Sequence, residues 1–507
     1  MKKIPSVVVF ARVLVAMIAL ASPLSVQGGD GPPEATMDPI VRTVDLEITE
    51  EAMVTLSDGT AAHVRLIGIE TRRDDAGLAI REASVRVEVN GETIDLPVAN
   101  YNLPRTVAGV QIDATIVRDY LDEAHHNRWG LEKDARLRLW PEGSPWIEPG
   151  TFVYPVLQRW GADVTQGPNE PAYVGGTTIG DRVYYHNEVD FGGAEGLVPV
   201  VAATDGLVVS AVGETLPGYD ETPVRARYDA VYILDDRGWY YRYSHLVGLD
   251  LRIRIGQRVE AGHPVGVIGK EGHSGGWSHL HFGATGPQPS GDWGIEEVYP
   301  FLWQAYHEQY DPAVIAWARP HRVAAVGKPV ELDGSLSRSS SGSELEFEWT
   351  FTDGGTASGS RVTRTYDKPG TYSEILKVTD ENGNVDYDFA YVRVMNPDKA
   401  EYRIPHLHAS YHPSLGVRPG HEVTFMARIF STSHGYETWD FGDGSPTVQT
   451  RSRDGQWRDP DVEMHARDGY ASITHQYREP GHYIVRVERT NEHGEPAIAH
   501  LHVVVEE

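Results

Sequence analysis

One motif occurs twice in the last third of the chain, and it restricts each copy to a β-rich fold. Each copy has an aromatic strand that ends in an Asp-Gly turn, at residues 348–355 and 438–444. A Tyr-x-x-Pro-Gly-x-Tyr corner follows, at 366–372 and 477–483. The spacing fits an antiparallel sandwich of about 90 residues, in which the alternating Trp and Phe side chains face the core. We therefore predict two tandem sandwiches.

The rest of the chain also predicts a mainly β fold with several cores. A chain of 507 residues is too long for one core. Its 52 Gly and 32 Pro are spread widely, as in folds with many short strands and turns. The predicted units are a signal peptide (1–21, with cleavage as late as 28), a linker (22–39), an N-terminal β-rich domain (40–162), a second β-rich domain (163–312) and two sandwiches (313–396 and 401–507).

Local patterns predict individual elements inside these units. Asn90-Gly91 follows an alternating stretch and predicts a hairpin turn. Short helices are expected at 116–123 and near 300–310. Apolar stretches in the second domain predict buried strands at 199–203, 206–209, 230–234 and 265–268, and an aromatic strand at 239–243.

The first residues resemble a secretory signal. Lys2 and Lys3 precede an apolar run from Val7 to Ala21, which ends in the small-x-small pattern Ala19-Leu20-Ala21. A membrane anchor is the alternative, but the run is short for a span of about 20 residues and contains Arg12. We expect a secreted protein, periplasmic or extracellular, with no stable membrane insertion after cleavage.

Composition excludes several kinds of chemistry. The chain has no Cys, which excludes disulfides, a thiolate metal site and a Cys nucleophile. Its net charge is −28, and loss of three cationic residues with the signal gives about −31. Such a charge disfavours nucleic acid and anionic membranes as partners.

Histidines and one aspartate in the second domain form the candidate site. His186 and Asp190 lie four apart, His245 follows the aromatic strand, and His279 and His281 form a His-x-His pair. On a strand, residues two apart share a face, so the last two rings would stand side by side. Imidazole and carboxylate are zinc ligands, and a catalytic zinc takes three protein ligands and leaves one position open.

Each of these signals is weak alone, because a single His-x-His pair more often lies on a surface or in a core. The hypothesis of a zinc site rests on the occurrence of all these signals, in this order, within one domain. His273 is interpreted as a loop residue. The other histidine pairs lack matching ligands and are interpreted as surface or cross-strand residues: His125-His126, His406-x-His408 and His500-x-His502.

The second domain resembles the lysostaphin/LytM-type glycyl-glycine endopeptidases over about residues 180–300. The resemblance includes the five residues above and three further segments, at 199–206, 256–262 and 268–269. The two tail units resemble PKD domains, which are immunoglobulin-like sandwiches.

These resemblances imply a secreted zinc metalloendopeptidase with one Zn²⁺ in its peptidase domain. His186, Asp190 and His281 would bind the metal. His279 would act as the general base, and His245 would orient the water and stabilise the oxyanion, although the two roles are exchangeable. The expected substrates are peptidoglycan peptides or Gly-rich proteins, and the PKD-like units would contact a polysaccharide or protein surface.

Two other functions fit the same domains. A LytM-like domain of weak activity can bind and regulate cell-wall enzymes, and a PKD-based protein can serve as a surface interaction protein. Retention of the three metal ligands His186, Asp190 and His281 argues against the first alternative, and the second leaves the five-residue site unexplained.

The sequence departs from the family pattern at two places. Glu188 stands where the family has Gly in His-x-Gly-x-Asp, so we expect an altered turn or an added carboxylate. An insertion at about 213–227 is expected to form a wall of the groove. The N-terminal domain could block the groove, with Asn100 or Asn102 as the candidate contacts. Asp380, Asn382 and Asn384 offer a calcium site, but a hairpin turn is the favoured interpretation.

Overall fold

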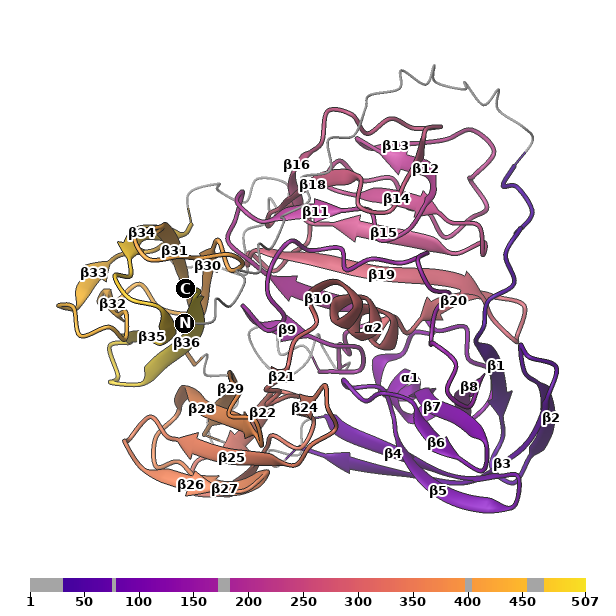
Figure 1. The fold of residues 1–507 in the computed structure, drawn as a ribbon, viewed down its shortest axis with the longest axis horizontal. Helices are drawn as coiled ribbons and strands as arrows, with labels where there is room; N and C mark the ends of the chain where they lie inside the picture. Colours follow the sequence, from indigo (N-terminus) through magenta and orange to yellow (C-terminus); the bar gives the residue numbers. More distant parts are fainter. Residues whose placement is uncertain (1–30, 75–78, 172–182, 397–403, 454–468) are drawn as a thin grey trace, which may run out of the picture.

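The computed structural model describes residues 31–74, 79–171, 183–396, 404–453 and 469–507 (Figure 1). The predicted signal peptide and its cleavage sites lie outside these residues. Two α-helices occur within the described ranges, α1 (Arg118–Ala124) and α2 (Tyr299–Tyr310), close to the two predicted helices. The other regular elements there are strands, which confirms the mainly β fold class.

None of the helices in the described part of the chain has the length and apolar character needed to span a membrane.

The N-terminal unit contains two four-stranded antiparallel sheets. Its strands are β1 (Arg42–Leu46), β2 (Glu51–Thr55), β3 (Ala61–Arg73), β4 (Ile80–Val89), β5 (Glu92–Pro97), β6 (Arg105–Val107), β7 (Val110–Val117) and β8 (Ala135–Pro141). Their orders are β1-β8-β7-β6 and β2-β3-β4-β5. Asn90 and Gly91 both have positive φ, 48° and 88°, and close the β4–β5 hairpin as predicted.

The second unit is built around a nine-stranded sheet. The strands of this unit are β9 (Thr165–Gln166), β10 (Val189–Gly192), β11 (Pro199–Val201), β12 (Gly206–Ala211), β13 (Glu214–Thr215), β14 (Val231–Leu234), β15 (Tyr240–Ser244), β16 (Leu246–Leu249), β17 (Arg258–Val259), β18 (Pro264–Ile268), β19 (His279–Pro287) and β20 (Trp293–Glu296). All the buried strands predicted there are present, each within a few residues of its expected bounds. The main path is β13-β12-β14-β15-β19-β10-β9, and a second sheet has the order β11-β18-β16.

The centre of this sheet is apolar on one face and polar on the other. Leu280 and Phe282 of β19 are fully buried, and Tyr241 stacks on Phe282 with ring centroids 6.1 Å apart. The neighbouring residues of β19 therefore point to the opposite face. The aromatic strand β15 serves packing, since Tyr243 accepts a hydrogen bond from the Ala203 amide (2.7 Å).

Apolar side chains from both sides of residues 162 and 163 pack in one core. The domain boundary expected there from the sequence stays a prediction. Phe152, Tyr154 and Trp160 belong to the same apolar cluster as the strands of the second unit. Trp160 contacts Trp303 of α2 edge to face, with ring centroids 5.3 Å apart. These aromatic contacts fasten the N-terminal unit to the helix beside the central sheet.

The tail contains the two predicted sandwiches. Their strands are β21 (Val314–Ile315), β22 (Arg322–Ala325), β23 (Pro329–Asp333), β24 (Arg338–Ser339), β25 (Leu345–Thr350), β26 (Thr356–Ser358), β27 (Arg361–Thr365), β28 (Gly370–Asp380), β29 (Val385–Met395), β30 (His406–His412), β31 (Glu422–Phe430), β32 (Glu437–Asp440), β33 (Val448–Thr450), β34 (Ala471–Gln476), β35 (Gly481–Thr490) and β36 (Pro496–Val505). Trp349 and Trp439, the motif tryptophans, are both buried in their cores as expected.

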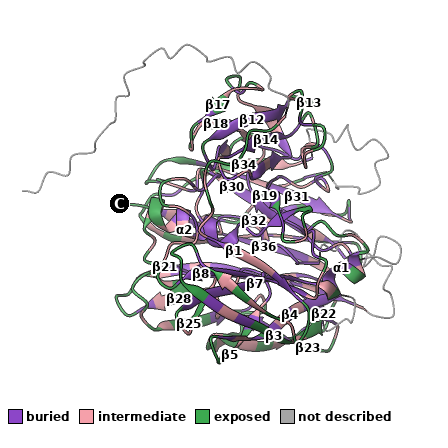
Figure 2. Ribbon diagram, turned by 90° about the vertical axis from the view of Figure 1, so that its right-hand side faces the viewer, coloured by how far each residue is buried: buried purple, intermediate pink, exposed green. Residues whose placement is uncertain are grey.

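The two sandwiches are not independent domains, because strands of both belong to one continuous sheet. β28 of the first pairs with β36 of the second in parallel at Thr371 and Ala497, which gives the path β22-β29-β28-β36-β35-β32-β33. β36 and β19 are largely buried inside the molecule (Figure 2).

Asp380 accepts hydrogen bonds from the backbone of Asn382 (3.0 Å) and Asn384 (2.8 Å), so this carboxylate caps the hairpin turn favoured by the sequence.

Candidate metal centre

Strand register brings the five predicted site residues together. β10 pairs with β19 so that Asp190 lies opposite His281, and β15 pairs with β19 so that Ser244 also lies opposite His281. His245 directly follows β15, and His279 precedes His281 by two residues on the same face. All five side chains are buried.

Three of these residues present ligand atoms at distances that suit one metal ion. The Nε2 atom of His186 lies 3.0 Å from Oδ2 of Asp190 and 3.3 Å from Nδ1 of His281. Nδ1 of His281 lies 2.7 Å from Oδ1 of Asp190. Ligand atoms in a tetrahedral zinc site with bonds of ~2.0–2.1 Å are about 3.3 Å apart. The donor set and its spacing therefore fit a zinc ion.

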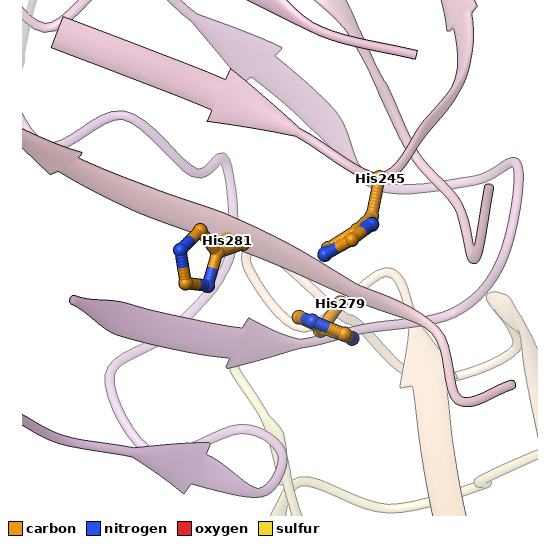
Figure 3. A group of neighbouring side chains, drawn as sticks. All are labelled: His245, His279 and His281. Carbon is orange, nitrogen blue, oxygen red and sulfur yellow. The ribbon is translucent and has the colours of Figure 1, made fainter. Parts of the chain in front are cut away.

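The other two histidines face this group but are held differently. Figure 3 shows His245, His279 and His281 turned toward one another. Nδ1 of His279 lies 3.1 Å from the Trp277 carbonyl, and Nδ1 of His245 lies 2.6 Å from the Glu271 carbonyl. A carbonyl only accepts, so each Nδ1 carries the proton and each Nε2 presents a lone pair. Nε2 of His279 lies 3.4 Å from Oδ2 of Asp190, beside the metal ligands.

His245 occupies a strained backbone position that Asp229 stabilises. Its φ is 68°, in the left-handed region that non-glycine residues rarely adopt. The buried carboxylate of Asp229 accepts a hydrogen bond from the His245 amide (3.0 Å) and pairs with Arg227. Burial raises the pKa of Asp229, but the hydrogen bonds from His245 and Arg227 hold it well below its ordinary value. No local sequence signal marked Asp229, because its role depends on a contact across 16 residues.

The second sandwich packs directly on the loop that precedes His279. Trp277 stacks on His279, with ring centroids 3.9 Å apart, and its edge contacts His408 of β30 at 5.2 Å. The Tyr470 hydroxyl accepts a hydrogen bond from the Ser278 amide (2.8 Å) and contacts Nδ1 of His408 (2.6 Å). The interpretation of His408 as a surface or cross-strand residue was therefore incomplete, because this side chain is buried against the site.

Other histidines fall in the predicted places or close to them. His125 is exposed, and His273 lies in a loop that lines the cavity described below. His500 and His502 lie on β36 with buried side chains, so they are cross-strand core residues rather than surface residues.

Glu188 adds a carboxylate to the site. Its Oε2 atom lies 2.5 Å from Nε2 of His281 and 3.7 Å from the Arg242 guanidinium. Burial opposes ionisation, but the charge and hydrogen bond of His281 bring the pKa of Glu188 down to about 2. Gly283 makes room for this side chain, since a Cβ there would collide with Glu188. The added carboxylate expected from the sequence is thus present, and it holds the nitrogen of His281 that faces away from the metal group.

A cavity of about 1030 Å³ opens onto these residues. Residues 222–225 and Arg227 line it, so the insertion forms a wall as predicted. Asn127 and Arg128 of the N-terminal unit line it too, whereas Asn100 and Asn102 do not, which corrects their choice as blocking contacts. Residues of both sandwiches, among them Tyr391 and His408, complete the lining.

Three segments of the chain match models of known protein families. Residues 184–290 match the family model for peptidase family M23, and residues 311–394 and 406–505 match models for the PKD domain.

Solved structures with similarity include a protein from Ruminococcus gnavus ATCC 29149 described as a candidate glycyl-glycine endopeptidase, lytM. It is 21% identical with a TM-score of 0.22, and the match covers 31% of this chain and 61% of that one. Helicobacter pylori Csd3 is 11% identical with a TM-score of 0.21, over 53% of this chain and 82% of that one. Fibronectin(III)-like modules of Clostridium thermocellum CbhA are 12% identical with a TM-score of 0.15, over 38% of this chain and 94% of theirs.

The segment that matches peptidase family M23 contains the five candidate site residues, and the two PKD matches contain the repeated sandwich motif. The chain contains a segment that matches peptidase family M23, followed by two segments that match the PKD domain.

Proposed function

We propose that this chain is a secreted zinc metalloendopeptidase that hydrolyses peptide bonds in peptidoglycan cross-links or Gly-rich peptides. The observation that carries the proposal is the convergence of His186, Asp190 and His281 on one point, beside two histidines whose Nε2 lone pairs are available. A metal site with three protein ligands leaves a position for water.

The residues around the metal suit a division of labour. When bound, zinc polarises the scissile carbonyl and lowers the pKa of water to ~7. His279, protonated at Nδ1 by its bond to the Trp277 carbonyl, accepts a proton from the attacking water at Nε2 and passes it to the leaving amine. His245 has the same tautomer, so its neutral ring orients the water as an acceptor and does not donate to the oxyanion. We assign His279 as the base because its Nε2 lies beside the metal ligands, 3.4 Å from Oδ2 of Asp190.

The test measures release of new amino termini from purified peptidoglycan by the full-length mature protein. We expect release that a zinc chelator abolishes, that added zinc restores, and that His279→Ala slows about 10²–10⁴-fold. The matched control is His421→Ala, an exposed histidine outside the cavity, which should leave release unchanged.

Absence of release from peptidoglycan, together with zinc-dependent cleavage of a Gly-rich protein, would move the substrate to the second class. A protein that neither binds zinc nor cleaves either substrate would contradict the proposal and favour a regulatory role.

A further inference from the structure

The cavity above the site is rich in arginine although the chain as a whole is acidic. The sequence has 73 Asp and Glu against 45 Lys and Arg. Among the described residues that line the cavity, seven are arginines and three are carboxylates. The arginines are Arg81, Arg128, Arg225, Arg227, Arg242, Arg322 and Arg393. Positive charge is therefore concentrated where the substrate would enter.

These arginines come from different parts of the chain and surround the metal group. Two belong to the N-terminal unit, three to the peptidase domain and two to the first sandwich. A guanidinium nitrogen of Arg227 lies 3.4 Å from Nδ1 of His245. Tyr184 contacts His186 with ring centroids 6.5 Å apart, and the charge of Arg128 acts on Tyr184. Basic groups therefore lie near both His245 and His186.

Several of the arginines are neutralised within the protein, but two are not. Arg227 pairs with Asp229, and Arg322 with Glu82. Arg128 and Arg225 are exposed and form no ion pair with any residue that the structure describes. Their charge is available to a ligand in the cavity.

Arginine binds carboxylates with two parallel hydrogen bonds, and these are stronger inside a cavity than in open water. An uncharged glycine chain has no side-chain group that would use them. We infer that the cavity selects peptides that carry carboxylates close to the scissile bond over uncharged Gly-rich chains. This inference rests on the proposed function and narrows its substrate class.

The test compares purified peptidoglycan with the same material after its free carboxylates are converted to amides. We expect amidation to lower kcat/KM about tenfold or more, mainly through KM, since each charged hydrogen bond contributes strongly. The double variant Arg128→Gln/Arg225→Gln should reduce this preference to less than about threefold. Arg418→Gln, on an exposed arginine outside the cavity, should retain it.

A second measurement separates failure of this inference from failure of the proposed function. Equal cleavage of the two peptidoglycans overturns the inference and leaves the endopeptidase in place. If neither peptidoglycan is cleaved, peptide binding tests the inference without relying on hydrolysis. Fluorescent Ala-Glu-Gly-Gly-Ala and its uncharged counterpart Ala-Gln-Gly-Gly-Ala-amide are titrated against the full-length His279→Ala protein. Tighter binding of the acidic peptide that weakens with salt supports the inference, and equal binding overturns it.

Discussion

The two histidine groups of the site differ in what holds each ring. His186, Asp190 and His281 form one possible metal group, and His245, His279 and His281 form another, each with ligand atoms within 4.8 Å. The first contains a carboxylate, and its ring nitrogens converge without backbone partners. In the second, backbone carbonyls bind Nδ1 of His245 and His279. The difference that separates the groups is the Asp190 carboxylate, which contacts ring nitrogens of both His186 and His281 and supplies the first group with a charged ligand.

The largest expected effect comes from removing the carboxylate that only the first group has. Asp190→Ala should lose bound zinc and all hydrolysis, because it removes one of three ligand groups, the carboxylate that lies next to both His186 and His281. Zinc content is measured by elemental analysis of the dialysed full-length protein, with Asp122→Ala on the surface of α1 as control. Full zinc content in Asp190→Ala would show that the first group does not bind the metal, and would assign the metal to the second group.

His279→Ala should separate the two groups in the opposite way. We expect it to keep one zinc per chain while the rate falls about 10²–10⁴-fold, the usual contribution of a general base. The measurement is zinc content beside release of amino termini. Loss of zinc from this variant would make His279 a ligand and refute its role as the base.

Glu188→Gln should have a smaller effect on metal binding. Gln keeps the shape of Glu188 but loses the charge beside Nε2 of His281. Outer-shell partners of this kind change metal affinity by ~10–100-fold. Competition with a chromophoric chelator measures zinc affinity without relying on activity. An unchanged affinity would mean that Glu188 only fills the space beside Gly283.

Sequence patterns predicted the fold class well because its signals are local. Alternation marked the strands, Asn90-Gly91 marked a hairpin, and the repeated motif marked both sandwiches. His279-x-His281 lies on one strand, so period two was enough to expect both rings on one face.

Contacts made by distant segments left no such signal. Asp229 supports the backbone of His245, and Tyr470 supports the loop before His279 from 192 residues away. The space that Gly283 leaves for Glu188 depends on a pairing between strands and not on either local stretch. Sequence reasoning could flag Glu188 as a departure, but only the fold assigns it a partner.

A buried histidine remote from the site shows what burial does to an imidazole that has no metal-binding partners. Its replacement should change only the stability of the protein at low pH. His500 of β36 contacts the Ser373 hydroxyl (3.0 Å) and stacks near Phe389, with no carboxylate among these contacts. Burial, aided by the charge of Arg486, lowers the pKa of His500 to about 3. Burial with a nearby positive charge therefore keeps this histidine neutral, whereas a metal ligand also needs other ligand groups that converge on the same point.

The sign of the pH effect follows from that lowered pKa. Below the ordinary value of ~6.5, the unfolded chain takes up a proton at His500 and the folded chain does not. The stability associated with this group is fully present above pH 6.5 and falls as the pH drops toward 3. Between pH 7 and 5 we expect His500 to cost about 1–2 kcal/mol. His500→Gln, which keeps a hydrogen-bonding group but cannot titrate, should remove that share of the acid shift in the urea midpoint. His421→Gln, at an exposed position, should leave the shift unchanged, and an equal shift in wild type and His500→Gln would show that His500 does not resist protonation.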